Sequence, residues 1–143
     1  MYNDIAAQAE QKKCVFCDLK DKYILYEKDG LVVTVNIFPY IDGHLLVIPR
    51  RHVESFKQLT IKEITTNYEL TKQAIDILEK EMGIVGFWMI LREGQTGSAS
   101  GKSVKHLHWN ILPYEEGLNT WHYREIKNTP LELATRLRPF FKK

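Results

Sequence analysis

The chain has 143 residues, of which 44% are hydrophobic and 27% are charged, a composition typical of a soluble globular protein. Its formal net charge of +2 is too small to indicate a nucleic-acid partner or an anionic membrane surface. The first residues lack the apolar core of a signal peptide, and the longest apolar run is too short to span a membrane. We therefore expect a cytoplasmic protein with a single domain over residues 1–143.

The N-terminal arm, residues 1–20, contains a weak helical pattern over 3–12 and then the sequence CVFC, from Cys14 to Cys17. Two cysteines at this spacing could be a redox pair, two thiolate ligands of a metal, or thiols without a role. A redox pair belongs at the start of a helix in a βαβ unit, which this sequence lacks. Zinc would need two further ligands. The candidates are the five histidines of the chain: His44, His52, His106, His108 and His122.

Three β-strands are predicted at the start of a core that spans residues 21–113. The segments 23–27, 31–36 and 44–49 are rich in β-branched and aromatic residues, as strands are. The dipeptide Asp-Gly between the first two segments is typical of a hairpin turn. These strands are therefore expected to form an antiparallel meander.

A long helix is predicted to follow Thr60, which opens the capping-box sequence Thr-Ile-Lys-Glu. Residues then recur at steps of three and four, which predicts a helical stripe that lies on the sheet. The stripe consists of Ile61, Ile64, Tyr68, Thr71, Ile75, Leu78 and Met82. Gly83 predicts the end of the helix.

Two further strands are predicted at 84–93 and 103–113, joined by a loop with three glycines. A short helix is predicted to begin at Thr129, within a C-terminal segment 114–143, because Thr-Pro is a typical helix start. The order β-β-β-α-β-β-α predicts an α+β domain. Its antiparallel sheet would have about five strands, with the long helix and the short C-terminal helix on one side.

The last predicted strand carries His106, His108 and Asn110 at alternate positions, so their side chains share one face while apolar residues take the other. This pattern favours a strand that lines a site. A half-exposed strand with two surface histidines would give the same pattern. The two imidazoles could also be paired ligands of a catalytic metal, but the sequence offers no convincing further ligand for such a site.

The loop TGSASGKS resembles a phosphate-binding P-loop but fails two requirements. Its glycines, Gly97 and Gly101, are separated by too few residues, and Ser103 leads into a strand where a P-loop leads into a helix. Backbone N–H groups at its glycines, with Lys102 and Ser103, could still hold a phosphate. The alternative is an ordinary flexible hairpin loop.

Together these motifs resemble the histidine triad (HIT) superfamily, whose signature is H-φ-H-φ-H-φ-φ, where φ is apolar. HLHWNIL (106–112) matches it at every position except Asn110. NIFPYIDGHLLVIPRRH (36–52) resembles the strand pair on the nucleotide side, and REGQTGSASGKSVKHLHW (92–109) resembles the phosphate loop and catalytic strand. The Asn-x-aromatic-Pro-Tyr sequence is similar to the branch with diadenosine-polyphosphate phosphorylases and, more distantly, galactose-1-phosphate uridylyltransferase. A HIT-like fold is the expectation.

The resemblance implies a nucleotide hydrolase or nucleotidyltransferase that acts at the α-phosphate of a dinucleoside polyphosphate or related nucleotide. His108 aligns with the nucleophile that becomes a nucleotidyl-histidine, and one imidazole nitrogen can attack phosphorus if the other donates its proton to a fixed acceptor. His44 aligns with the family's early histidine, which orients the catalytic strand or contacts phosphate. Ser103 and the loop would hold the phosphate oxygens.

Nucleotide-binding positions are also implied by the resemblance. Asn36 aligns with the ribose-binding position. Ile37 and Phe38 are candidates for the base-binding wall or for ordinary core. Arg92, where many members carry Asn, would supply a cation to phosphate or be solvated. Gly101 and Lys102 fall in the phosphate loop.

The resemblance further implies that His52 and His106 join Cys14 and Cys17 in a zinc site, as CVFC resembles the opening of zinc-containing members. Four protein ligands make such a Zn²⁺ structural, because no position is left for water. HIT-like domains usually pair as homodimers through the long helix and a neighbouring strand, and the same is expected here. His122, beyond the signature, is interpreted as a surface histidine.

Asn110 stands where the signature has its third histidine. An amide can donate and accept hydrogen bonds, but it cannot become a cation or shuttle a proton. The alternative function is therefore a nucleotide-binding sensor or scaffold with weakened catalysis.

Overall fold

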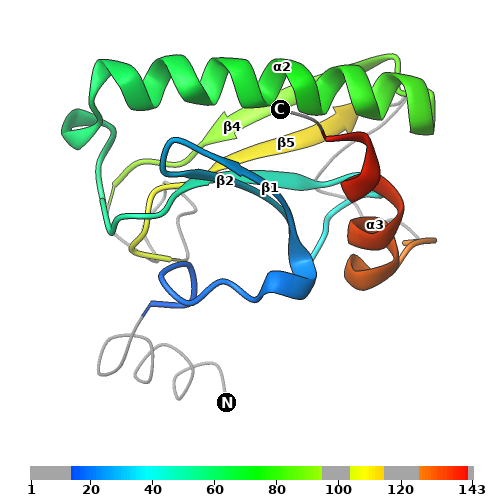
Figure 1. Ribbon diagram of the computed structural model, residues 1–143, viewed down its shortest axis with the longest axis horizontal. Helices are drawn as coiled ribbons and strands as arrows, with labels where there is room; N and C mark the ends of the chain where they lie inside the picture. The colour runs from blue at the N-terminus through cyan, green and yellow to red at the C-terminus, as the bar shows by residue number, and fades with distance from the viewer. Residues whose placement is uncertain (1–13, 95–103, 115–125, 142–143) are drawn as a thin grey trace.

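The computed structural model describes residues 14–94, 104–114 and 126–141 (Figure 1). Its helices and strands are β1 (Ile24–Lys28), β2 (Leu31–Val35), β3 (Leu45–Pro49), α2 (Ile61–Met82), β4 (Gly86–Leu91), β5 (Trp109–Tyr114) and α3 (Pro130–Leu137). Three short 3₁₀ turns are η1 (Asp21–Tyr23), η2 (Phe56–Gln58) and η3 (Arg138–Phe140). The predicted order of elements is confirmed. The helix predicted at 3–12 lies outside the described residues.

The strands form one antiparallel sheet in the order β1-β2-β3-β5-β4, which confirms the predicted five-stranded architecture. The first hairpin turns at Asp29 and Gly30, whose φ angles of 47° and 81° explain the preference for Asp-Gly there. Every residue of β2 and β3 is buried. β5 lies between β3 and β4, so the strand that carries the triad-like sequence is an inner strand of the sheet.

The long helix α2 lies across one face of the sheet, and the segment before β1 lies on the opposite side (Figure 1). Thr60 caps α2 through a reciprocal capping box with Glu63, and Gly83 ends it in the left-handed conformation, as predicted. Both helices contribute to one core, in which α3 buries its apolar face. Among the described residues, no helix is long and apolar enough to cross a membrane.

The predicted apolar stripe of α2 is wrong in its first half. Ile61 and Tyr68 are 79% and 66% exposed, and only from Thr71 onward does the stripe contact the core. Steps of 3.5 residues drift by about 20° per heptad on an α-helix of 3.6 residues per turn, so the stripe starts off the buried face and approaches it later. The buried face consists of Thr66, Asn67, Leu70, Thr71, Ala74, Ile77 and Leu78.

Candidate functional site

The triad-like residues His106, His108 and Asn110 point to the face of the sheet opposite α2. The residues between them, Leu107 and Trp109, belong to the core, which confirms the predicted alternation. The three polar side chains are only 0%, 8% and 2% exposed. The alternative of a half-exposed strand with two surface histidines is therefore wrong.

β5 begins at Trp109, later than the predicted start at 103, because its pairing with β3 stops at Val47 although β3 continues to Pro49. In the β3–β5 ladder Val47 faces Trp109, so the next step would place Leu107 opposite Pro49. Proline has no N–H to donate to a ladder, and the Leu107 N–H donates instead to Val53 O at 2.7 Å. Both histidines therefore lie on a short segment outside the regular ladder. β4 is also shorter than the predicted 84–93.

His108 is held in a single tautomer. Its Nδ1 lies 2.8 Å from the backbone oxygen of His106, and since a carbonyl can only accept, Nδ1 carries the hydrogen. In the neutral ring the lone pair is then on Nε2. This is the arrangement that a nucleophilic imidazole requires.

His44 is completely buried and belongs to an amide network, which we define as Asn36, Tyr40, His44 and Asn110. Its Nε2–H donates to Asn110 Oδ1 at 2.8 Å, and its Nδ1 accepts the Tyr40 backbone N–H at 3.2 Å. Burial lowers the pKa of His44 to about 4, with smaller contributions from the charges of Arg92 and His108, against the effect of the Asn110 hydrogen bond. His44 is therefore neutral near pH 7.

Asn110 uses both ends of its amide within the protein. Its Oδ1 accepts from His44, and its Nδ2 donates to Ile90 O at 3.3 Å. The side chain thereby connects the segment before β3 with β4 through β5. In this structure, Asn110 acts as a fixed hydrogen-bond connector and has no proton to transfer.

The predicted nucleotide-binding residues lie around this network. Asn36 Oδ1 accepts the Phe38 N–H at 2.8 Å, which fixes the turn after β2. Ile37 and Phe38 are 49% and 77% exposed, so the core alternative for these two side chains is wrong. Gly101, Lys102, Ser103 and His122 lie outside the described residues, and their assigned roles stay predictions.

Arg92, just beyond β4, also reaches the network. Its Nη1 donates to Tyr40 Oη at 3.3 Å, and its guanidinium lies 5.6 Å from the centre of the Tyr40 ring. Arg92 is partly buried, so the alternative of a fully solvated side chain is wrong. The Tyr40 ring in turn lies 5.1 Å from the His44 ring, which brings a cation beside the buried imidazole.

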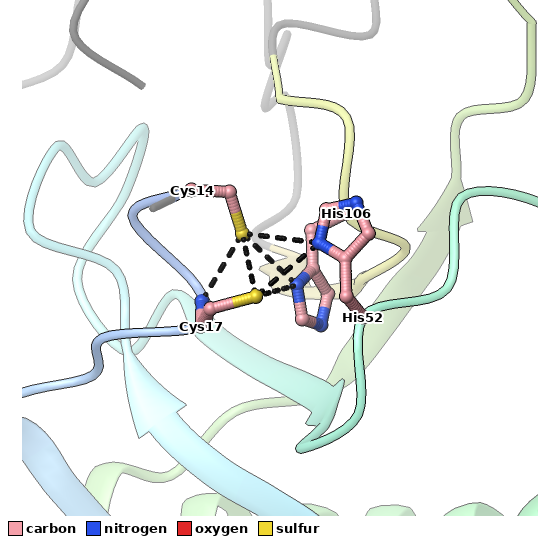
Figure 2. Close-up of side chains that lie close together, drawn as sticks. All are labelled: Cys14, Cys17, His52 and His106. Atoms are coloured by element: carbon pink, nitrogen blue, oxygen red, sulfur yellow. Dashed lines mark hydrogen bonds between the residues drawn. The ribbon is translucent and has the colours of Figure 1, made fainter. Parts of the chain in front are cut away.

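Cys14, Cys17, His52 and His106 form a cluster that we call the metal centre (Figure 2). Their four potential ligand atoms all lie within 4.8 Å of one another. The sulfurs are 3.1 Å apart, and each lies 3.2–3.5 Å from the Nδ1 atoms of both histidines. Zn–S bonds of about 2.3 Å and Zn–N bonds of about 2.0 Å place a tetrahedral sulfur and nitrogen roughly 3.5 Å apart and two sulfurs roughly 3.8 Å apart. The four sulfur–nitrogen distances match this geometry, and binding would move the two sulfurs apart by about 0.7 Å. The donor set of two thiols and two imidazoles therefore fits a metal ion of this kind.

The histidines of the metal centre are oriented by their second nitrogens. His106 Nε2 donates to Pro49 O at 2.7 Å, and His52 Nε2 lies 3.1 Å from a carboxylate oxygen of Glu54. Both hydrogens are thus on Nε2, which leaves Nδ1 to face the sulfurs, the usual outer arrangement of metal-binding histidines. Burial also lowers the pKa of His106, which favours the neutral form that a metal requires.

Two alternatives from the sequence do not fit this geometry. His106 and His108 use their Nδ1 atoms in different directions, toward the cysteines and toward a carbonyl, so they are not paired ligands through those atoms. Cys14 and Cys17 lie in a turn that approaches two histidines, so they are not isolated thiols.

Two aromatic side chains of the site were not predicted. Tyr40 bridges His44 and Arg92, and the ring of Phe16 lies 4.8 Å from the ring of His108. Each belongs to a motif that the sequence singled out, since Tyr40 ends NIFPY and Phe16 lies inside CVFC. The signal was therefore present as sequence position, but the contacts depend on how the two turns fold.

The sequence model of the HIT domain family matches residues 19–117. The chain is a member of the HIT family. A HIT-like protein of Methanocaldococcus jannaschii is 28% identical over 124 residues, which cover 83% of this chain and 93% of that protein. An AP-4-A phosphorylase of Mycobacterium tuberculosis is 33% identical over 97 residues, 62% of this chain and 49% of the phosphorylase.

Solved structures confirm the HIT fold. A Zn-bound histidine triad protein of Mycobacterium smegmatis superposes with a TM-score of 0.73 at 21% identity, over 89% of this chain and 91% of that one. At this identity the likeness concerns the fold.

Proposed function

We propose that this HIT protein is a nucleotide hydrolase or nucleotidyltransferase that acts at the α-phosphate of a dinucleoside polyphosphate or related nucleotide. The observation that carries the proposal is the His108 Nδ1–H bonded to the His106 carbonyl oxygen. It leaves the lone pair on Nε2, in a ring that is almost entirely buried. The similarity to an AP-4-A phosphorylase supports the substrate class.

In the proposed reaction Nε2 of His108 attacks the α-phosphorus. A P–N bond forms, the bond to the bridging oxygen breaks, and the remaining phosphate or nucleotide leaves with that oxygen. Water then attacks the phosphorus, loses a proton to solvent and releases the nucleoside monophosphate. If phosphate or a second substrate attacks instead, the nucleotidyl group leaves on that acceptor, as a nucleoside diphosphate in the case of phosphate. In each case the P–N bond breaks and its electron pair returns to Nε2. Arg92 supplies positive charge near the phosphates. The loop with Lys102 and Ser103 would bind their oxygens.

The test is intact-mass spectrometry after incubation with a panel of nucleotides and quenching without acid. We expect a nucleoside monophosphate adduct in the wild type that is lost in His108→Ala. The matched control is Val15→Ala, which changes a half-exposed side chain and should keep the adduct. A folded protein with neither adduct nor turnover across the panel would overturn the proposal.

The second candidate is a nucleotide-binding sensor or scaffold. It is favoured by Asn110, whose amide is held on both sides and cannot move a proton. It predicts nucleotide binding in calorimetry without turnover, and activity on substitution Asn110→His. An active wild type would eliminate it, as would an inactive Asn110→His variant that folds and binds nucleotide.

We also propose that the metal centre binds one structural Zn²⁺. The support is the convergence of two thiols and two oriented imidazoles, with a Zn-bound protein among its structural neighbours. Elemental analysis should find one zinc per chain in the wild type and none in a double Cys14→Ser, Cys17→Ser variant. Metal-free wild type after purification in zinc-supplemented buffer would contradict this.

We also propose that the chain forms a homodimer. β4 is an edge strand of the sheet with exposed Phe87, Trp88 and Met89, while α2 exposes Ile61 and Tyr68. Exposed apolar side chains on an unpaired edge are typical of an interface. Sedimentation should give a dimer that Met89→Lys converts to a monomer, and a monomeric wild type would contradict it.

A further inference from the structure

We infer that Phe16 is a positioning residue that links the metal-binding turn to the imidazole of His108. This inference rests on the proposed function, in which His108 is the nucleophile. Phe16 is neither a metal ligand nor a predicted site residue, and its role follows from where the CVFC turn places its ring.

The contact between the two rings is direct. The centre of the Phe16 ring lies 4.8 Å from that of His108 with the planes at 65°, and 6.1 Å from that of His106 at 87°. Both geometries are edge-to-face, the arrangement that aromatic rings prefer. The neighbouring Val15, on the same turn, is 47% exposed. The turn therefore directs one of its two central side chains onto the triad-like histidines.

The turn is anchored at both ends by potential metal ligands. The Cys17 N–H bonds to Cys14 O at 3.0 Å and lies 3.1 Å from Cys14 Sγ, so the four residues form a closed loop. When Cys14 and Cys17 bind a metal together with His52 and His106, this loop is tied to the segment that precedes β5. The position of Phe16 is then set by the metal centre.

The Phe16 ring adds a restraint on His108 that differs from its hydrogen bond to His106. Its hydrogen bond to the His106 carbonyl fixes the Nδ1 atom, but the terminal torsion of a histidine has a broad energy minimum. The Phe16 ring restricts that rotation by packing against the imidazole. These two contacts of His108 originate at the metal centre, since one comes from the backbone of His106 and the other from the CVFC turn. Loss of either should misdirect Nε2 without removing it.

The test compares Phe16→Ala and Phe16→Leu with Val15→Ala, a matched change on the same turn. The chemical readout is the rate of adduct formation at saturating nucleotide, separated from KM. For Phe16→Ala we expect this rate to fall roughly ten- to a hundredfold, the scale of a nucleophile displaced by a fraction of an ångström to an ångström. The KM of Phe16→Ala should change by less than about threefold. Phe16→Leu should recover part of the rate because it retains apolar bulk against the His108 ring. Val15→Ala should match the wild type in both rate and KM.

A second readout needs no nucleotide. ¹⁵N-detected NMR at one fixed pH should show His108 ring signals that shift or broaden in Phe16→Ala while zinc content stays equal to that of Val15→Ala. If Phe16→Ala loses zinc, the same comparison is made with Phe16→Leu. Chelation of the wild type should change the His108 signals in the same direction.

Three outcomes would overturn the inference. A raised KM with an unchanged saturated rate would make Phe16 a substrate-binding wall. Unchanged His108 signals in the zinc-loaded Phe16 variant would show that Phe16 does not restrain His108, even if the rate fell. Equal effects of Val15→Ala and Phe16→Ala would show that both substitutions act through the stability of the turn and not through the contact between Phe16 and His108. If no nucleotide forms an adduct, the proposed function fails, whereas the NMR comparison still decides whether Phe16 restrains His108.

Discussion

The two ends of the triad-like face are held by different chemistry. At one end the metal centre gathers two thiols and two imidazoles from three distant parts of the chain. At the other end the amide network around His44 and Asn110 consists of neutral hydrogen bonds between the segment before β3, β5 and β4. His108 lies between the two.

This difference in chemistry indicates that the metal centre and the amide network are disrupted under different conditions. Thiols and imidazoles bind a metal only in their deprotonated forms, and the thiols must also be reduced. The metal centre therefore depends on the supply of metal and on the oxidation state of its cysteines. The amide network needs neither, but it requires His44 to stay neutral and Asn110 to keep both partners. Changes at one end should therefore leave the other intact, and this independence can be tested.

The largest expected effect is the loss of a metal ligand. Cys14→Ser should abolish zinc binding and lower the free energy of unfolding by more than about 4 kcal/mol, because loss of a structural metal is among the most destabilising changes. Elemental analysis and thermal unfolding measure both, with Val15→Ala as the control. If Cys14→Ser also removed the acid sensitivity expected of His44, the two ends would not be independent.

The next effect concerns pH. His44 has a folded pKa of about 4 against about 6.5 in an unfolded chain. As pH falls from 6.5 to 4, the unfolded chain gains a proton that the folded chain excludes, so stability decreases, by about 3 kcal/mol in total. The groups that face His44 are the charged or titratable Arg92, His108 and Tyr40 and the amides of Asn36 and Asn110. Denaturant unfolding across this pH range should show the decrease in stability in the wild type. The His44→Gln variant should lack the part of the decrease that comes from His44.

A smaller effect is expected from Asn110→Ala. It leaves the buried His44 Nε2–H without its acceptor and Ile90 O without the Asn110 donor, which costs about 1–3 kcal/mol. Zinc content should not change, because the hydrogen bonds of the amide go to His44 and Ile90 and not to the ligand atoms of the metal centre. A drop in zinc content equal to that of Cys14→Ser would show that the amide network supports the metal centre.

Local patterns explain what could be predicted from the sequence. The capping box at Thr60, the Thr-Pro helix start at Thr129, the Asp-Gly hairpin, and the alternation along the triad-like strand each depend on a few neighbouring residues. The buried face of α2 could not be predicted, since the helix carries apolar residues on two sides and packing selects one. Ile61 and Tyr68 lie on the side that packing left exposed.

The candidate site, like the fold, could be predicted only where a short local pattern encodes it. Spacing identified CxxC and the alternating histidines, but it left five histidines as candidate ligands, and His52 and His106 followed only from the family resemblance. Their approach depends on where β3 ends and the chain turns, which no local pattern encodes. Tyr40 and Phe16 act through turn conformations, so their contacts became visible only in the structure.

The smallest expected effect separates the role of Arg92 from that of the amide network. Tyr40→Phe removes the hydroxyl that accepts from Arg92 but keeps the ring beside His44. Because this hydroxyl belongs to an exposed side chain, stability should change by less than about 0.5 kcal/mol. If Arg92 is a phosphate contact that Tyr40 holds in place, KM should rise about two- to tenfold, the value of one hydrogen bond, while the saturated rate and zinc content stay constant. Arg92→Ala should raise KM further, because it removes the charge itself. A Tyr40→Phe variant whose KM equals that of the wild type, beside a strongly impaired Arg92→Ala, would show that the cation binds phosphate without help from the phenol.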